Sequence, residues 1–451
     1  MSGYIYLPME IKSREYMAKY ILALELADRG YQVISGKSAE VEKLCLFGPP
    51  GLYIGTSLMK QHYQLFERLK KRGHCIAAVD EEGLVYYNKD SFLRTKVDAN
   101  TLSILSAFFT WGEHHTKLVA EKCPESFPIL KQVGNVRMEL LKEPYRRIFC
   151  KEANTLTEKY GRFILINTNF GAFNHYKGIE AYWNSLSHLV DMDSTLVDVT
   201  EKKLKHQERI FYSFADMANK VAAEFPDYQI ILRPHPSESI ERWQDQFHYP
   251  NIEVVHEGSV IPWIIASDCI IQQNCTTAIE ARCLDKPVFS FLPDYDSNFD
   301  SGLPNKVALC FKDCEELIAA LHTIAVSPEQ YETMLKEKTN EVLTDYIENM
   351  KNERNAFDDC ALALEGLTLP TPKAENWGRV RALRWLYEQV SLALNQKKRE
   401  QRKYIEHKFP STPEEEWNAQ KELFAELFAP NYRNITLLQL SENSYLLRKN
   451  Q

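Results

Sequence analysis

Short apolar runs alternate with segments of helical periodicity along the first two thirds of the chain, and this alternation constrains the fold more than any other feature. Runs of this length are typical of buried strands, and strands separated by helices form parallel sheets. The pattern predicts an α/β fold with two Rossmann-type, doubly wound sheets. We expect strands at residues 4–7, 31–34, 43–46, 52–54, 75–79, 107–110 and 131–133, then within 162–170 and at 228–232, 252–255, 268–271 and 288–291.

These strands fall into two groups, which we interpret as separate domains. Residues 1–150 form an N-terminal α/β domain, residues 151–327 a C-terminal α/β domain that binds a nucleotide-sugar, and residues 328–451 a helical tail. Two such domains facing a cleft are typical of GT-B glycosyltransferases, whose substrates bind between the domains. Many other α/β enzymes share the pattern, so the loops must decide the function.

Composition and charge argue against several classes of protein. The net charge of −8 makes a broad nucleic-acid-binding face and a nucleic-acid partner unexpected. The N-terminus lacks the features of a signal peptide, and no run of about 18 apolar residues is present to span a bilayer. The ten cysteines lack paired zinc-site spacing, which indicates free thiols in a reducing cytoplasm. We therefore expect a cytoplasmic protein, and the oligomeric state stays open.

A histidine between two prolines follows the expected strand 228–232. Arg233 and His235 lie where ligands bind to a parallel sheet, beyond the carboxyl end of a strand. The flanking prolines restrict the backbone, so the His235 imidazole is placed to donate to a phosphate. The alternative is that His235 only caps the strand.

A second polar segment follows the expected strand 268–271. Asn274, Thr276 and Thr277 open a helix whose first N–H groups and hydroxyls suit an anion, although plain capping of the helix is the alternative. Glu280, one turn later, is a weaker candidate for a ribose hydroxyl. Polar residues after the first strand of this domain are further donor-binding candidates, with a polar turn as the alternative. They are Asn167, Thr168 and Asn169.

Between these segments, the expected strand 252–255 leads to an acid and a glycine. Glu257 is placed to accept hydrogen bonds from the two hydroxyls of a ribose, and the backbone of Gly258 and Ser259 to contact a base edge. Trp263 stacks on that base or, as the better-supported alternative, belongs to the core. A carboxylate between two phosphate-binding segments favours a nucleotide over a bare anion.

Acidic residues follow two expected strands of the first domain. Asp80 and Glu81 end one strand together with Glu82, and Glu113 follows another. Neighbouring carboxylates raise one another's pKa, which suits a general base, although a solvated acidic turn is the alternative. We expect no metal and no other cofactor. Residues placed on the acceptor side are Glu10, Arg14, Asn135 and Arg137.

The tail carries a basic segment, residues 397–403, at the end of an expected helix. Such a helix can lie on anionic lipid, which makes peripheral association with the inner face of the cytoplasmic membrane one interpretation. A solvated helix end with favourable dipole charges is the alternative.

Taken together, these motifs resemble a known family. The chain resembles bacterial surface carbohydrate biosynthesis proteins and, more distantly, GT-B Kdo transferases and sialyltransferases that use CMP-sugars. The resemblance covers residues 4–325 and rests on short motifs in both domains. These are Glu10 with Arg14-Glu15, Asp80-Glu-Glu-Gly83, Trp111-Gly-Glu113, Gly134-Asn135-x-Arg137, Arg233-Pro-His-Pro236, Glu257-Gly-Ser259 with Pro262-Trp263, and Asn274-Cys-Thr-Thr-Ala-Ile-Glu-Ala281.

The resemblance implies a CMP-activated donor, namely Kdo or another nonulosonate. His235 and the Thr276/Thr277 pair would hold its phosphate, and Glu257 its ribose. Retaining Kdo transferases use an aspartate near the first strand of the second domain, whereas residues 167–175 contain no carboxylate here. A retaining or inverting outcome therefore stays open.

We expect a glycosyltransferase that moves a sugar onto a surface polysaccharide or lipopolysaccharide precursor, so the acceptor is a glycan or glycolipid. His235 and the Thr-Thr helix start would stabilise the leaving phosphate, with Asp80, Glu81 or Glu113 as the base. One alternative is a CDP-glycerol or CDP-ribitol polyol-phosphate transferase. Another is a non-catalytic module of a polysaccharide assembly complex.

Overall fold

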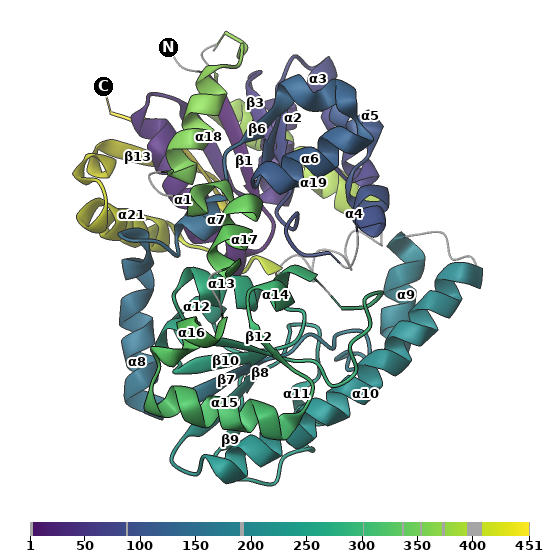
Figure 1. Cartoon of the computed structure of the whole chain (residues 1–451). Helices are drawn as coiled ribbons and strands as arrows, with labels where there is room; N and C mark the ends of the chain where they lie inside the picture. Colours follow the sequence, from purple (N-terminus) through teal and green to yellow (C-terminus); the bar gives the residue numbers. More distant parts are fainter. Residues whose placement is uncertain are drawn as a thin grey trace. The chain divides into compact units, whose positions relative to one another are not determined.

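The computed structural model describes residues 3–86, 89–189, 194–300, 302–335, 338–351, 354–371, 375–394 and 408–450. The chain forms two compact units, which Figure 1 colours along the sequence. Unit 1 comprises Met1–Gly83, Asp90–Ile148 and Thr344–Gln451, and unit 2 comprises Leu84–Lys89 and Phe149–Leu343. The chain therefore returns to unit 1 after completing unit 2.

Unit 1 contains, within the described residues, an eight-stranded sheet in the order β13-β14-β2-β1-β3-β4-β5-β6. The strands from β2 to β6 are parallel, and β1, β3 and β5 are buried along their whole length. Such continuous burial is expected of parallel strands covered by helices on both faces. The strands are β1 (Tyr4–Met9), β2 (Gln32–Lys37), β3 (Leu52–Gly55), β4 (Cys75–Val79), β5 (Ala107–Thr110), β6 (Leu130–Gln132), β13 (Ile435–Ser441) and β14 (Ser444–Lys449).

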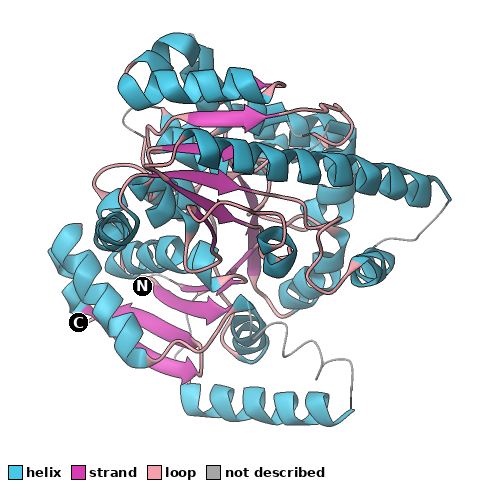
Figure 2. Ribbon diagram, turned by 90° about the horizontal axis from the view of Figure 1, so that it is seen from below, coloured by secondary structure: helices cyan, strands magenta, loops and turns pink. Residues whose placement is uncertain are grey.

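Helices and short 3₁₀ turns connect these strands, and the strands lie between helices (Figure 2). The helices are α1 (Lys12–Asp28), α2 (Ser38–Phe47), α3 (Tyr63–Lys71), α4 (Lys89–Lys96), α5 (Ala99–Ser103), α6 (Glu113–Lys122), α7 (Val136–Glu139), α18 (Ala356–Glu365), α19 (Trp377–Leu394) and α21 (Glu414–Leu427). Helix α17 (Lys338–Tyr346) begins in unit 2 and ends in unit 1. The basic segment 397–403 of the tail lies outside the described residues. The 3₁₀ turns are η1 (Lys60–His62), η2 (Pro124–Ile129), η3 (Tyr145–Phe149), η4 (Glu348–Met350) and η5 (Pro430–Asn434).

Unit 2 contains a six-stranded sheet in the order β12-β11-β10-β7-β8-β9, and every pairing within it is parallel. Its strands are β7 (Phe163–Asn167), β8 (Gln229–Arg233), β9 (Ile252–Val254), β10 (Cys269–Gln272), β11 (Val288–Phe291) and β12 (Leu309–Phe311). Its helices are α8 (Cys150–Tyr160), α9 (Ile179–Leu189), α10 (Ser194–Glu224), α11 (Ile240–Gln244), α12 (Val260–Ala266), α13 (Thr277–Cys283), α14 (Gly302–Lys306), α15 (Cys314–Val326) and α16 (Gln330–Leu335).

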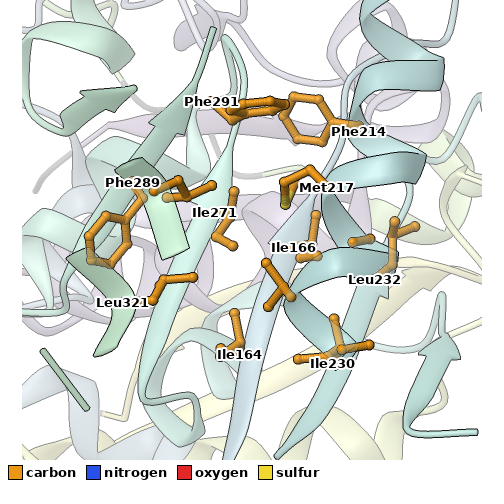
Figure 3. Packing of buried hydrophobic residues seen from close by; sticks show 14 of the residues in the cluster. Ile164, Ile166, Phe214, Met217, Ile230, Leu232, Ile271, Phe289, Phe291 and Leu321 are labelled. Atoms are coloured by element: carbon orange, nitrogen blue, oxygen red, sulfur yellow. The ribbon is translucent and has the colours of Figure 1, made fainter. Parts of the chain in front are cut away.

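The core of unit 2 lies between its sheet and two long helices. Figure 3 shows Phe214 and Met217 of α10 and Leu321 of α15 packed against apolar side chains of the strands. Because these side chains come from neighbouring strands, the core fixes the strand ends relative to one another. The strand residues labelled there are Ile164, Ile166, Ile230, Leu232, Ile271, Phe289 and Phe291.

Two sequence predictions about local structure are wrong. Residues 43–46 are not a strand but belong to α2, where Val41, Leu44 and Cys45 are buried with the i, i+3, i+4 spacing of a helix face. The C-terminal tail is helical in α17, α18, α19 and α21 but ends in the hairpin β13–β14. Strand β14 pairs antiparallel with β2, which would otherwise be an edge strand with unpaired backbone groups.

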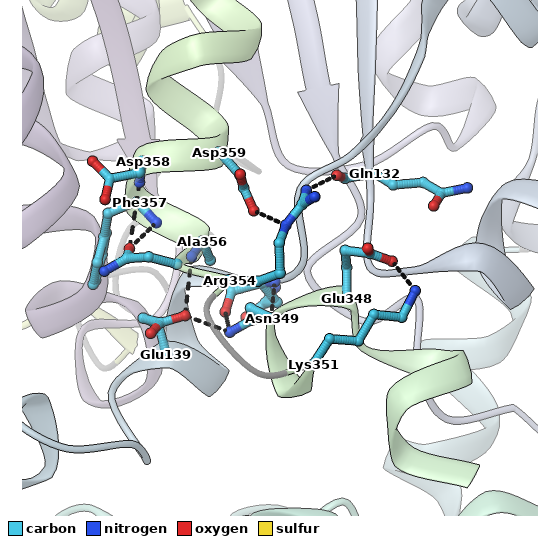
Figure 4. Close-up of polar contacts among 12 residues, drawn as sticks. Gln132, Glu139, Glu348, Asn349, Lys351, Arg354, Ala356, Phe357, Asp358 and Asp359 are labelled. Atoms are coloured by element: carbon cyan, nitrogen blue, oxygen red, sulfur yellow. Dashed lines mark hydrogen bonds and ion pairs between the residues drawn. The ribbon is translucent and has the colours of Figure 1, made fainter. Parts of the chain in front are cut away.

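A buried amide joins the returning chain to unit 1 (Figure 4). Asn349 Oδ1 accepts the backbone N–H of Asn135 at 2.9 Å, and Asn349 Nδ2 donates to Glu139 at 2.8 Å. The same Glu139 carboxylate accepts the N–H of Ala356 at 2.9 Å. A Cβ at Gly134, where φ is +76°, would lie 2.2 Å from Asn349 Oδ1, so only glycine fits there.

Candidate functional site

His235 lies in the loop after β8, at the carboxyl edge of the parallel sheet of unit 2, and its side chain is exposed. Its Nδ1 accepts the backbone N–H of Ser237 at 3.2 Å and lies 2.8 Å from the Ser237 hydroxyl oxygen. With Nδ1 acting as an acceptor, the neutral imidazole carries its proton on Nε2. The loop therefore holds the ring in a tautomer that donates from Nε2.

A buried carboxylate orders this loop. Glu238 accepts the backbone N–H of His235 at 2.9 Å and of Phe170 at 3.1 Å, and the hydroxyl of Thr168 at 2.9 Å, all through Oε1. Its Oε2 accepts the indole N–H of Trp243 at 2.8 Å. Burial raises the pKa of Glu238, whereas these four donors favour its charged form. Glu238 was not among the residues predicted from the sequence; an acid three residues after the histidine was the available signal.

The loops after β7 and β8 touch directly. Tyr176 N–H donates to the Ser237 carbonyl at 2.9 Å, and Ser239 N–H donates to that of Asn174 at 2.8 Å. A Cβ at Gly171 would lie 2.0 Å from Ser237 Oγ, so the close approach of the two loops depends on glycine. Through Ser237, the β7 loop helps to set the His235 ring.

Arg233, predicted to bind the donor, is buried and turned toward the loop after β9. Its guanidinium donates to the Glu257 carbonyl at 2.7 Å and to the Gly258 carbonyl at 3.2 Å, and lies 4.8 Å from the centre of the Trp263 ring. Burial lowers the pKa of Arg233 to about 10. The negative charges of Glu152 and Glu257 act to raise this pKa but only partly offset the effect of burial. In these contacts Arg233 shapes the turn in which Gly258 has a φ of +61°. The Glu257 side chain is exposed, and Trp263 is buried in the core.

A second buried carboxylate orders the loop after β10. Asp300 accepts from the Gln273 amide at 2.6 Å, from the Asn274 amide and from the backbone of Asp296 at 2.7 Å. Asn274 has a φ of +55°, a left-handed conformation that asparagine tolerates better than most residues. His206 of α10 lies 3.3 Å from the same carboxylate. Asp300 and His206 are far from this loop in sequence, and no sequence motif indicated them.

Several polar atoms at this sheet edge are buried without a hydrogen-bond partner among the described residues. They include Asn167 Nδ2, at the end of β7, Asn174 Oδ1, in the loop after β7, and Thr277 Oγ1, at the start of α13. A buried polar atom left without a partner costs about 1–3 kcal/mol, so each is a candidate for a ligand contact. Thr276 is half-buried at the N-cap of α13, Glu280 is buried, and Asn169 Nδ2 lies 3.5 Å from the Asn274 carbonyl.

In unit 1, Asp80 follows β4 and is buried. Its Oδ1 accepts the N–H of Glu82 at 3.1 Å, and its carbonyl accepts the indole N–H of Trp111 at 2.6 Å. Burial raises the pKa of Asp80 to about 6; Lys96 opposes this rise, and the charges of Glu82 and Glu81 add to it. A carboxyl group that titrates near neutral pH suits a general base.

Glu81 belongs to a buried ion cluster that no sequence motif indicated. Lys19 Nζ lies 2.8 Å from a carboxylate oxygen of Glu81, from one of Glu15 and from the Pro8 carbonyl. Burial acts to lower the pKa of Lys19, but the two carboxylates overcome it and raise that pKa. Glu81 Oε2 is buried without a partner among the described residues.

Glu113 is exposed on the first turn of α6 and forms an ion pair with Lys117 at 2.6 Å. This contact lowers the pKa of Glu113, which makes it a weaker base than Asp80. The acceptor-side candidates also lie at the carboxyl ends of strands. Glu10 contacts the Thr56 hydroxyl, Arg14 pairs with Glu82 at 3.2 Å, Asn135 caps α7, and Arg137 donates to the Glu81 carbonyl at 3.3 Å.

Comparison with known proteins identifies the fold. No protein-family model matches the sequence, and no curated protein matches it. A UDP-N-acetylglucosamine 2-epimerase structure matches with a TM-score of 0.52 and 12% identity, over 83% of this chain and 98% of the other. The UDP-GlcNAc 2-epimerase of Methanocaldococcus jannaschii matches with a TM-score of 0.51 and 13% identity, over 81% and 100%. The chain has a GT-B-like fold.

At this identity the likeness establishes architecture and leaves activity open. The wall teichoic acid polymerase TagF, at a TM-score of 0.42 and 11% identity over 70% of this chain and 71% of its own, is too dissimilar to support a conclusion. The predicted α/β class is confirmed, with a sheet in unit 2 that is parallel throughout and a sheet in unit 1 that is parallel from β2 to β6. None of the described helices has both the length and the apolar character needed to cross a membrane. Within the described residues, no group of three or more His, Cys, Asp and Glu side chains is arranged to hold a metal ion. The donor, base and acceptor roles stay predictions.

Proposed function

We propose that this chain is a glycosyltransferase that takes a sugar from a nucleotide donor and transfers it to a surface polysaccharide or lipopolysaccharide precursor. The observation that carries the proposal is the His235 ring, exposed at the carboxyl edge of the unit 2 sheet and held by Ser237 in a fixed tautomer. The buried Glu238 carboxylate accepts the backbone N–H of His235 and so holds the same loop. A donor group oriented in advance stabilises developing charge without reorganisation during the reaction.

The reaction breaks the bond between the sugar carbon and the phosphate oxygen of the donor. His235 Nε2–H donates to that phosphate oxygen as negative charge develops on it, and the nucleotide leaves. Asn167 Nδ2 and Thr277 Oγ1, buried and unpartnered among the described residues, supply further donors to the ligand. An acceptor hydroxyl forms the new glycosidic bond, and its proton passes to a carboxylate, which we assign to Asp80 because of its raised pKa.

For the donor, we propose a CMP-activated acidic sugar such as Kdo or another nonulosonate. The support is the resemblance of the Arg233–Pro236, Glu257–Ser259 and Asn274–Ala281 motifs to proteins that use CMP-sugars. The exposed Glu257 carboxylate, beside a turn that Arg233 holds through two carbonyls, is available to a ribose.

The test is turnover of CMP-Kdo, CMP-sialic acid, CDP-glycerol and UDP-GlcNAc by the full chain, with His235→Ala as the variant. We expect nucleotide release from a CMP-sugar and a loss of about 100-fold in His235→Ala. His248→Ala, which replaces another exposed histidine of unit 2, is the matched control and should be unaffected.

Each other outcome overturns the proposal in a distinct way. Turnover of CDP-glycerol alone would identify a polyol-phosphate transferase. Conversion of UDP-GlcNAc to its 2-epimer would identify an epimerase, in keeping with what the fold neighbours are named for. If His235→Ala leaves polymer production intact in cells and CMP does not shift the melting temperature, the chain is a non-catalytic module.

A further inference from the structure

A cavity of about 400 Å³ lies at the amino edge of the unit 2 sheet. Its lining comes from the starts of β7, β8, β10 and β11 and from the segments where α10, α12 and α15 end. The proposed donor site lies at the carboxyl edge of the same sheet. Strand β7 has five residues of about 3.3 Å each, so the two edges are about 16 Å apart. The cavity is therefore separate from the donor site, and its volume is within the range of small-molecule sites.

Much of the cavity wall is apolar and well packed. Phe225, Leu321 and Ile324 are buried, as is Ile164 of β7, which Figure 3 labels together with Leu321. All four belong to the hydrophobic core of unit 2, so this wall is formed before any ligand arrives. A ligand that fills the cavity must bring an apolar body to this wall.

The polar groups of the cavity gather around the start of β10. Asp268 pairs with Arg162 at 2.8 Å, and the Arg162 guanidinium lies 4.6 Å from the centre of the Tyr228 ring. Lys286 Nζ donates at 2.8 Å to the carbonyl of Ser267, the residue before Asp268. A few polar groups placed together in an apolar cavity are typical of a site that orients its ligand.

Two of these polar groups are donors with unused capacity. Tyr228 is buried, and its hydroxyl has no hydrogen-bond partner among the described residues; the Asp268 carboxylate is near it without the geometry of a hydrogen bond. Lys286 is half-buried and has three N–H groups, of which one has an acceptor among the described residues. Burial lowers the pKa of Lys286, and the charge of Asp268 offsets this only in part. An acceptor oxygen on a ligand would satisfy both donors.

We propose that this cavity binds a small monocarboxylic acid with an apolar body. The carboxylate would accept hydrogen bonds from Lys286 and Tyr228, and the body would lie against the apolar wall. Lys286 forms no ion pair within the described part of the chain, so its one charge matches one carboxylate. Of the two acids in the lining, Asp268 is paired with Arg162 and Asp285 is exposed, so neither leaves an unpaired buried charge to repel the ligand.

The test is isothermal titration calorimetry of the full chain with phenylbutyrate, phenylbutanol and phenylbutylamine, which share one apolar body and differ in the head group. We expect one molecule of the acid to bind per chain, about tenfold or more tighter than the alcohol, and the amine not to bind. Lys286→Met keeps the apolar stem and removes the charge, so it should weaken binding of the acid about tenfold and leave binding of the alcohol unchanged. Tyr228→Phe should also weaken binding of the acid, without lowering thermal stability, because the deleted hydroxyl has no partner among the described residues.

Further variants place the ligand in the cavity. Ala325→Trp puts a large side chain into the lining and should abolish binding of the acid and the alcohol. Lys312→Met, at an exposed lysine of unit 2 outside the cavity, is the matched control, and His235→Ala changes the opposite sheet edge; both should bind the acid as the wild type does. Thermal unfolding would check that each variant is folded.

The proposal is overturned if phenylbutyrate does not bind saturably, or if it binds the folded Ala325→Trp variant as tightly as the wild type. Undiminished binding by both Lys286→Met and Tyr228→Phe would also overturn it. Tighter binding of the amine or the alcohol would show that the cavity takes a different class of ligand. None of these outcomes depends on the proposed transfer reaction, because binding is measured without a donor.

Discussion

The Glu238 carboxylate accepts the backbone N–H of His235 at 2.9 Å. The Glu238 side chain is buried beneath the loop, whereas the His235 side chain is exposed. Glu238 is buried and gathers donors from the β7 loop, its own loop and α11, whereas His235 is exposed at the sheet edge. The exposed histidine thus depends on a buried acid three residues later. This relationship makes Glu238 a positioning residue whose effects on stability and on donor turnover can be separated.

Glu238→Gln should lower the free energy of unfolding by about 2 kcal/mol. In glutamine an NH₂ group replaces the Oε2 atom that accepts the Trp243 indole N–H, so two donors face each other. The remaining amide oxygen can still accept the backbone N–H of His235. Glu238→Ala removes every acceptor and should cost more, with a larger loss of donor turnover. Urea unfolding measures the first effect; Glu208→Gln, at an exposed acid of α10, is the control. An unchanged unfolding free energy in both Glu238 variants would contradict the assignment.

Gly171→Ala should destabilise unit 2 and reduce donor turnover together. Its new Cβ lies 2.0 Å from Ser237 Oγ, so the hydroxyl must leave the His235 ring. Adding Ser237→Gly makes room and should recover part of the lost stability, a coupling that a double-mutant cycle of thermal unfolding would measure. Gly302→Ala, where nothing lies within 4 Å, should have little effect. Purely additive effects would mean that the two loops do not touch as described.

Asp80→Asn should change how stability depends on pH. The folded chain raises the pKa of Asp80 from 3.8 to about 6, so it binds this proton more tightly than the unfolded chain does. The resulting stabilisation is present below pH 3.8 and is lost as the pH rises to about 6. At about 1.4 kcal/mol per pKa unit, the change is about 3 kcal/mol.

Asn keeps the oxygen that accepts the Glu82 N–H and has no charge to desolvate. Asp80→Asn should therefore lose less stability than the wild type between pH 4 and pH 6. Urea unfolding at a series of pH values would show the difference. Parallel stability curves for the two proteins would show that Asp80 has an ordinary pKa and is a poor candidate for the base.

Lys19→Met should be strongly destabilising, by about 3–5 kcal/mol at neutral pH. The change leaves the Glu15 and Glu81 carboxylates buried without their shared cation. The loss should shrink in acid, where these carboxylates can protonate. Lys71→Met removes an exposed ion pair with Glu67 and should cost at most about 1 kcal/mol. Similar losses in the two variants at neutral pH would contradict the buried cluster.

Much of the fold was accessible from the sequence because strand and helix periodicities are local. The strand that precedes His235 and the strand that precedes Asn274 were predicted close to β8 and β10. Parallel pairing then places their loops at one edge of the sheet. Residues 43–46 were wrongly predicted as a strand because a short apolar run fits a buried strand and one face of a helix equally well. The hairpin β13–β14 was missed because it is stabilised by pairing with β2, which lies far away in the sequence.

The sequence by itself determined which polar residues stand at the ends of strands, since chain order and strand period suffice for that. Only the tertiary structure decided where each side chain points. Arg233, expected on a ligand, donates to the carbonyls of Glu257 and Gly258. Asp300 organises Asn274 across 26 positions of sequence. The physical reason is that a buried polar group must find partners, and those partners come from whichever distant segments folding brings beside it.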